Sequence, residues 1–170
     1  MTTATIPAVR RTITVAAPVE HTFRTFTESF TTWWPAGYHI GKAEYAEAVI
    51  EPREGGRWFE RGVDDSECDW GRVLVWDPPG RLVLTWQING RWQYDPDPAR
   101  ASEIEVRFTA VDAGRTRVDL EHRLLERLVD GAAMHESISA EGGWGTLLQT
   151  FAAKLAGDSA ERPADEQAGG

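Results

Sequence analysis

Two histidines are the side chains in this sequence best suited to proton transfer, and they occur in different patterns. Between Val118 and Leu124 apolar residues alternate with charged ones, and His122 falls on the apolar positions. This alternation predicts a strand with one buried face, so we expect His122 to be hydrogen-bonded in the core or to lie in a cavity. Three roles follow for it: a satisfied core side chain, a polar anchor for a ligand, or a catalytic base. Burial without a charged partner would lower its pKa below about 6.5.

The second histidine, His39, comes directly after the segment Trp-Pro-Ala-Gly-Tyr at 34–38. Proline and glycine in this segment are typical of a loop, which we interpret as lying over the mouth of a cavity. His39 is then either an exposed loop residue or a residue that contacts a ligand. The sequence shows no second acid or base that converges on either histidine.

The sequence lacks the residue patterns required for metal binding, phosphate binding and nucleophilic catalysis. Neighbours on a strand point to opposite faces, so Glu121 and His122 cannot chelate one ion, and we expect no metal and no cofactor. The acidic run from Asp64 to Asp69 lacks the glycine and glutamate spacing of a calcium loop. Neither a GxSxG elbow nor the Lys-Ser/Thr of a phosphate loop occurs, and Cys68 is the only cysteine, which excludes an intramolecular disulfide.

Eight tryptophans in 170 residues are the most unusual feature of the composition. Each large aromatic side chain buries roughly 150–250 Å², so eight of them require either a large core or a lined pocket. Strand alternation places Trp86 on one face with its aliphatic neighbours, and Trp70, Leu74 and Trp76 together on a face of the preceding strand. We favour a pocket wall and predict a set of ligand-binding residues: Trp34, His39, Trp58, Trp70, Trp86, His122, Trp144 and Leu148.

These residues require elements that bring them together. The sequence predicts a first strand at 10–15, a helix that opens at Pro18, a short helix that ends at Pro35, about six strands up to residue 124, and a long helix over 137–155. Hairpin links and the absence of strand-helix-strand alternation predict an α+β fold, an antiparallel sheet with helices on one face. We expect one domain over 1–157 and a disordered acidic tail over 158–170.

Charge and hydropathy exclude two classes of partner. The net charge of −9 would repel a phosphate backbone, so we expect no nucleic acid. The longest apolar runs fall far short of the ~20 residues that cross a bilayer, so we expect no membrane insertion. Residues 1–9 carry no export signal pattern, which predicts a cytoplasmic protein.

Several motifs together carry a family resemblance from about Arg10 to Leu155. They are Ala17-Pro18-Val19-Glu20, Trp33-Trp34-Pro35, the segment EPREGGRW at 51–58, the hairpin WGRVLVWDPPGRL at 70–82, Thr85-Trp86, and Gly142-Gly143-Trp144. With them the chain resembles the AHSA1-like (activator of Hsp90 ATPase homologue 1-like) branch of the START-like, or SRPBCC, superfamily. The resemblance implies a helix-grip fold, in which a curved antiparallel sheet wraps around a long C-terminal helix and encloses a cavity.

The leading functional hypothesis is binding of a hydrophobic or aromatic small molecule, with Trp58, Trp86 and Trp144 as wall and His122 as polar anchor. The alternative is a cyclase or hydrolase-like enzyme in which His122 or His39 moves a proton inside the same cavity. Contact with an Hsp90-type chaperone follows only from the resemblance and is a minor alternative. The sequence leaves open whether the protein forms a homodimer.

Overall fold

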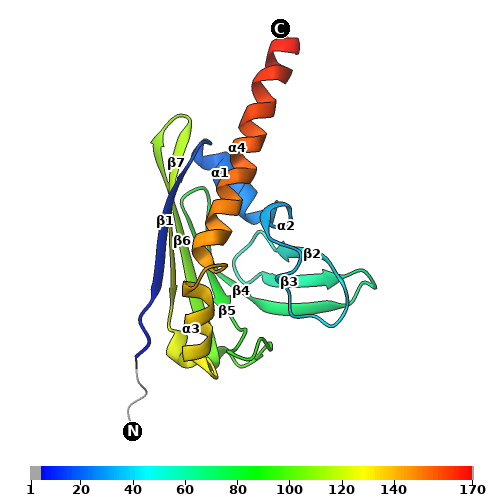
Figure 1. Ribbon diagram of the computed structural model, residues 1–170, viewed down its shortest axis with the longest axis vertical. Helices are drawn as coiled ribbons and strands as arrows, with labels where there is room; N and C mark the ends of the chain where they lie inside the picture. The colour runs from blue at the N-terminus through cyan, green and yellow to red at the C-terminus, as the bar shows by residue number, and fades with distance from the viewer. Residues whose placement is uncertain (1–4, 170) are drawn as a thin grey trace.

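Seven antiparallel strands form one sheet that curves around the last helix in the computed structural model, which describes residues 5–169 (Figure 1). The strands lie in the order β1-β7-β6-β5-β4-β3-β2. The strands are β1 (Val9–Val15), β2 (Tyr45–Ile50), β3 (Arg57–Gly62), β4 (Glu67–Asp77), β5 (Arg81–Trp86), β6 (Ser102–Asp112) and β7 (Arg115–Arg123), and the α-helices are α1 (Val19–Thr27), α2 (Phe30–Trp33), α3 (Gly131–Ser139) and α4 (Trp144–Gly169).

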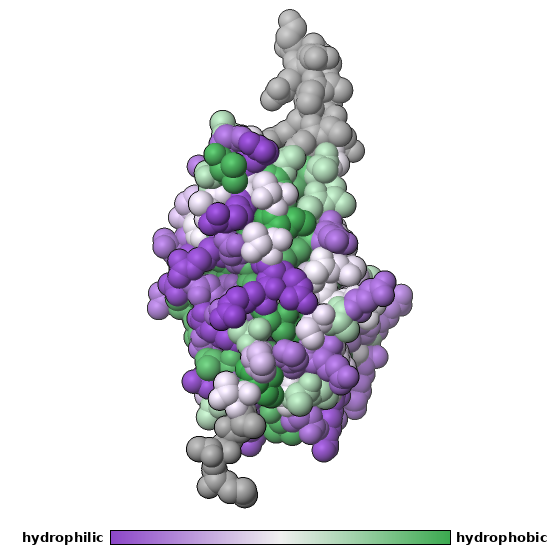
Figure 2. Space-filling view, turned by 60° about the vertical axis from the view of Figure 1, so that its left-hand side comes forward, coloured by the Kyte–Doolittle hydropathy of each residue, from purple (hydrophilic) through white to green (hydrophobic). Residues whose placement is uncertain are grey.

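The α+β helix-grip fold expected from the sequence is confirmed. The strands from β2 to β7 pair in chain order, each with the next. β1 forms the opposite edge of the sheet and pairs with β7, with Val9 opposite His122 and Val15 opposite Thr116. The outer face carries ion pairs such as Arg123 with Glu105. Figure 2 shows hydrophilic side chains spread over the side of the molecule that holds β1. The alternation in β6 and β7 therefore reflects one wet face and one face turned to the helices.

The phase expected for β4 is wrong at Leu74. Register shifts add a residue at Trp70 opposite β3 and another at Leu74 opposite β5, and each added residue reverses the faces of the residues after it. Trp70 and Val73 are therefore buried, whereas Leu74, which strict alternation placed beside Trp70, is exposed. Trp76, which follows both shifts, is partly buried and packs against Phe23 (5.1 Å between centroids).

The helix expected over 137–155 is two helices. α3 ends at Ser139 and α4 begins at Trp144, and Gly142 between them has a positive φ of 89°. A Cβ on Gly143 would lie 2.1 Å from the Ile138 carbonyl oxygen, so this turn requires glycine at two successive positions. α4 then continues beyond Gly157 to Gly169, so the segment expected as a disordered tail is helical up to that residue. Three alanines and two glutamates of residues 158–169 are good helix formers, and the last buried side chain described on this helix is Leu155.

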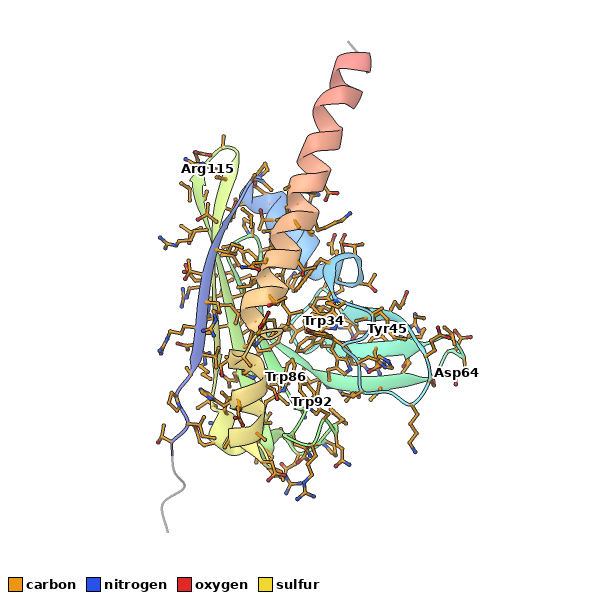
Figure 3. The ribbon with its side chains drawn as sticks, viewed as in Figure 1. Trp34, Tyr45, Asp64, Trp86, Trp92 and Arg115 are labelled. Atoms are coloured by element: carbon orange, nitrogen blue, oxygen red, sulfur yellow. The ribbon has the colours of Figure 1, made fainter. Side chains whose placement is uncertain are left out.

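The core divides into two parts along α4. Under α1 and α2, phenylalanines pack edge to face, as in the pairs Phe23 with Phe108 (5.2 Å between centroids) and Phe26 with Phe151 (5.3 Å). Toward α3, tryptophans replace them. Figure 3 shows Trp34, Trp86 and Trp92 in this second part, away from the β6–β7 hairpin at Arg115. No helix in the described part of the chain is long and apolar enough to cross a membrane.

Candidate ligand-binding cavity

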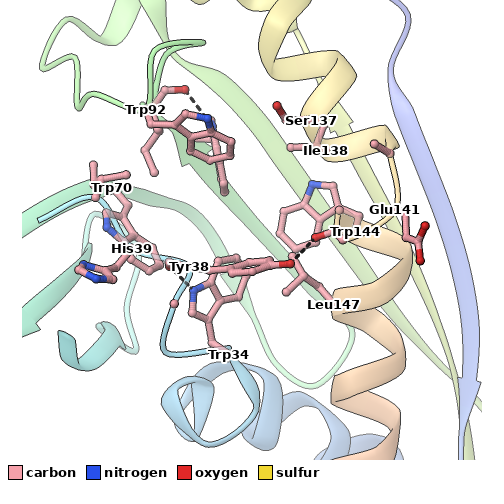
Figure 4. A pocket seen from close by; sticks show the side chains of 17 residues that line it. Trp34, Tyr38, His39, Trp70, Trp92, Ser137, Ile138, Glu141, Trp144 and Leu147 are labelled. Atoms are coloured by element: carbon pink, nitrogen blue, oxygen red, sulfur yellow. Dashed lines mark hydrogen bonds between the residues drawn. The ribbon is translucent and has the colours of Figure 1, made fainter. Parts of the chain in front are cut away.

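A cavity of about 440 Å³ lies between the sheet, the loop at 35–44 and the turn from α3 to α4 (Figure 4). Its volume falls in the range of about 300–1,000 Å³ typical of small-molecule sites. Aromatic side chains dominate the lining, and aliphatic residues, the glycines of the turn, Ser137 and Glu141 complete it. The main side chains are those of Trp34, Tyr38, His39, Trp70, Trp86, Ile88, Trp92, Ile138, Trp144 and Leu147.

The cavity wall is fixed by hydrogen bonds behind it. Four tryptophans donate their indole N–H to an acceptor of the protein itself, which leaves their ring faces and edges for a ligand. The pairs are Trp34 with the Tyr38 carbonyl (2.8 Å), Trp70 with Glu60 Oε1 (3.0 Å), Trp86 with the Ile88 carbonyl (2.9 Å) and Trp144 with His122 Nδ1 (3.1 Å). The wall therefore offers apolar aromatic surface instead of free donors.

The mouth of the cavity carries two half-exposed aromatic residues that the sequence analysis did not identify. The Tyr38 hydroxyl donates to the Gly142 carbonyl at 3.0 Å, a bond that joins the loop at 35–44 to the α3–α4 turn and is drawn in Figure 4. Trp92 is 48% exposed and has a positive φ of 60°, which is uncommon for a bulky residue. A large aromatic residue two positions after Gly90, in a mostly polar loop, was the available signal for Trp92.

His122 lies behind the wall and does not line the cavity. It is fully buried, and burial lowers its pKa to about 3, so the imidazole is neutral. Because an indole N–H only donates, Nδ1 of His122 is the acceptor for Trp144, and Nε2–H donates to Ser102 Oγ at 2.8 Å. Ser102 in turn donates to the Trp86 carbonyl. Of the three roles expected for His122, the structure favours the satisfied core side chain, which orients Trp144.

Two further predicted residues lie away from the cavity. Trp58 is fully buried behind the wall, where its ring packs against Trp70 (5.5 Å between centroids) and Trp86 (5.8 Å). Leu148 is also buried, and Leu147 lines the cavity in its place, because one helical residue rotates the side chain by about 100°. Trp34, His39, Trp70, Trp86 and Trp144 of the predicted set do line the cavity.

Glu60 of β3 is a buried acid that the sequence analysis missed. Its side chain is 2% exposed, and Oε1 accepts three N–H groups, from Ile40 (2.7 Å), Gly41 (2.8 Å) and Trp70 (3.0 Å). The other oxygen, Oε2, lies 3.0 Å from Nδ1 of His39. Glu60 is two residues beyond Trp58, and this even spacing was the signal that it points inward. One carboxylate thus connects the wall, the mouth loop and a histidine.

No group of three or more potential metal ligands occurs among residues 5–158, whose side chains the structure describes. A second hollow of about 620 Å³ adjoins the first, with Ile40 and Trp92 in both linings. It is more polar and contains Glu60, Asp64, Ser66 and other hydrophilic residues.

A curved sheet closed on a C-terminal helix, with a cavity between them, defines a helix-grip domain. Residues 16–156 match the family described as Activator of Hsp90 ATPase homolog 1-like protein, and the chain belongs to this family. Comparison with curated proteins gave no match.

Solved structures include two relatives above 30% identity. One, described as "An anthrahydroquino-Gama-pyrone synthase Txn09 complexed with SUM", is 43% identical, with 87% of this chain and 96% of that chain covered and a TM-score of 0.62. CalC from Micromonospora echinospora, described as a self-sacrificing resistance protein, is 34% identical, with 89% and 96% covered and a TM-score of 0.65. Protein NE0264 from Nitrosomonas europaea is 16% identical, with 90% and 96% covered and a TM-score of 0.61, and shows the shared fold alone.

Proposed function

We propose that the protein binds a flat, largely apolar aromatic molecule in the tryptophan-lined cavity. The observation that carries this proposal is that five tryptophans line one cavity and four of them have their N–H groups bonded to the protein. Such a wall interacts with a ligand through ring stacking, which contributes roughly 0.5–1.5 kcal/mol per contact beyond the area buried. Flat ring systems gain most from it, whereas a flexible acyl chain gains only from burial.

The relative with 43% identity supports the same ligand class. Its description names an anthrahydroquinone fused to a γ-pyrone, which is a planar polycyclic system. A cavity that accepts such a ring system is consistent with the size and lining found in this chain.

Tryptophan fluorescence tests the proposal directly. Titration with alizarin, a planar dihydroxyanthraquinone, should quench emission saturably with a dissociation constant in the micromolar range of about 1–50 µM, and palmitate should bind more weakly. Trp92→Ala should weaken alizarin binding about tenfold, since this residue is half-exposed and its removal leaves the core intact.

Trp76→Ala is the matched control. Trp76 packs against Phe23 (5.1 Å between centroids), in the other part of the core, and should leave alizarin binding unchanged while circular dichroism confirms folding. Absence of saturation below about 100 µM, or tighter binding of palmitate than of alizarin, would contradict the proposal.

Ring-closing catalysis in the same cavity is the second candidate function, favoured by the 43% identity to a protein described as a synthase. A hydroxylated aryl ketone incubated with the protein should then yield a cyclised product, detected by liquid chromatography with mass spectrometry. Binding of the ketone without any product would mean that the protein only binds it. Contact with an Hsp90-type chaperone is supported by the family description alone and stays a minor prediction.

A further inference from the structure

We propose that His39 and Glu60 form a proton-accepting pair for an acidic hydroxyl, phenolic or enolic, on the aromatic ligand. The inference rests on the proposed function, because it needs a ligand in the cavity that His39 lines. His39 would be the catalytic residue and Glu60 the positioning residue. Figure 4 shows His39 beside Trp70 on one side of the cavity, across from Trp144 and Glu141.

The hydrogen bonds of Glu60 determine its role. Three N–H donors converge on Oε1, so the protein itself engages this oxygen fully. Oε2 is then an acceptor for Nδ1–H of His39 at 3.0 Å. Because the carboxylate is 2% exposed and held from two chain segments, the mouth loop and β4, it has little freedom to turn away from the imidazole.

This contact selects the tautomer of His39. With the proton of the neutral ring on Nδ1, the lone pair is on Nε2, as in other carboxylate–histidine pairs. Among the described residues no hydrogen bond engages Nε2 of His39, and the side chain remains 25% exposed. The ring therefore has one nitrogen fixed by a buried acid and one free to meet a ligand atom.

The proposed step is a simple proton transfer. The O–H bond of the ligand breaks, its electron pair stays on the ligand oxygen, and the proton bonds to Nε2 of His39. The imidazolium that forms lies against the carboxylate of Glu60, which stabilises its charge. The ligand oxygen becomes a better nucleophile, and the proton returns to the ligand when the product or the unchanged ligand leaves.

The hydroxyl of Tyr45 and the thiol of Cys68 stay protonated near neutral pH and do not compete for this proton. Tyr45 of β2 has its ring centroid 5.7 Å from that of His39, and burial, with a smaller contribution from the charge of Glu60, raises the pKa of its hydroxyl. Burial and then the charge of Glu60 also raise the pKa of the Cys68 thiol on β4. The charge of Glu47 also raises the pKa of Tyr45, and the charge of Asp69 raises the pKa of Cys68. Lys42 lines the adjoining polar hollow.

The test uses alizarin, whose absorption moves to longer wavelength when a hydroxyl ionises. Bound to the full-length protein, the dye should lose its first proton about one pH unit or more below the free dye. His39→Gln and Glu60→Gln should each remove this shift, and His135→Gln on α3 is the control that should leave it in place. Ionisation of bound dye at the same pH as free dye would overturn the inference.

A second ligand separates a structural role from a chemical one. Unsubstituted 9,10-anthraquinone has no hydroxyl, so His39→Gln should weaken alizarin binding about tenfold more than anthraquinone binding. Equal losses for both ligands would mean that His39 only holds the mouth loop, and would overturn the inference. If neither ligand binds the unsubstituted protein, the proposed function itself fails for this ligand class, and the inference with it.

Glu60→Gln removes a buried acceptor and can prevent folding, so a measurement on the unsubstituted protein accompanies it. Nitrogen-15 NMR of the histidine rings distinguishes protonated from unprotonated nitrogens. The inference requires His39 to carry its proton on Nδ1 in the neutral state. A proton on Nε2 instead would overturn it.

Discussion

Two polar clusters, one around His122 behind the tryptophan wall and one around His39 and Glu60 beside it, use histidine in opposite ways. His122 is fully buried, bonds through both nitrogens to neutral protein groups, and is held neutral by burial. His39 bonds through one nitrogen to a buried carboxylate and keeps a quarter of its side chain exposed. The strand pattern singled out His122, yet the histidine that lines the cavity is the loop histidine, His39. The residue type alone does not assign a role, because the partner of each nitrogen decides it.

The largest expected difference between the clusters is in stability. His122→Ala should lower the free energy of unfolding by about 3 kcal/mol, because it leaves the Trp144 N–H without its acceptor and opens a void. His39→Ala, at a partly exposed loop position, should lower it by only about 1 kcal/mol. Urea denaturation of both variants checks this, and equal losses would break the comparison.

The pH dependence of stability should separate the same two residues. The pKa of His122 is about 3 when folded against 6.5 for the free side chain, so the unfolded chain takes up the proton first as the pH falls. His122 therefore costs no stability above pH 6.5 and lowers it by about 1.4 kcal/mol per unit from there down to pH 3. Between pH 7 and pH 5 the unsubstituted protein should lose about 2 kcal/mol more than His122→Gln. Parallel stability curves for the two proteins would show that His122 is not held neutral.

The mouth beside His39 should tolerate a change that affects ligand exchange more than folding. Tyr38→Phe removes an exposed hydrogen bond to the Gly142 carbonyl, which should lower the free energy of unfolding by about 0.5 kcal/mol. The dissociation rate of bound alizarin, measured by stopped-flow fluorescence, should rise several-fold, since the loop at 35–44 is no longer tied to the α3–α4 turn. An unchanged rate would mean that this bond does not restrain the mouth.

The smallest effect is expected at the far end of α4, which extends beyond the sheet in Figure 1. Cutting the chain after Gly157 removes the ion pair of Asp158 with Lys154 and the contact of Asp158 with His21 but, among the described residues, no side chain of the buried core. The thermal midpoint should stay within about 5 °C, because partly exposed ion pairs contribute little. A fall of about 10 °C or more would place the domain boundary, proposed at Gly157, further along the chain.

The fold could be predicted from the sequence because strand alternation, turn residues and the helical stripe all indicate the same arrangement. The errors in the elements depend on two inserted residues and one glycine turn: the bulges at Trp70 and Leu74 in β4 and the break at Gly142. The site was harder to predict than the fold for another reason. Glu60 and Trp70 are ten residues apart, and His39 reaches Glu60 from a loop, so their hydrogen bonds exist only after the sheet and the mouth loop pack together.

The central claim, that a flat aromatic ligand occupies the tryptophan-lined cavity, can be tested on all eight tryptophans at once. Indole N–H signals in a ¹⁵N–¹H spectrum report each ring during titration with alizarin. The signals of the five that line the cavity, Trp34, Trp70, Trp86, Trp92 and Trp144, should shift, while those of Trp33, Trp58 and Trp76 should move much less. Shifts centred on the second set, or no saturable shift in the first, would contradict the account.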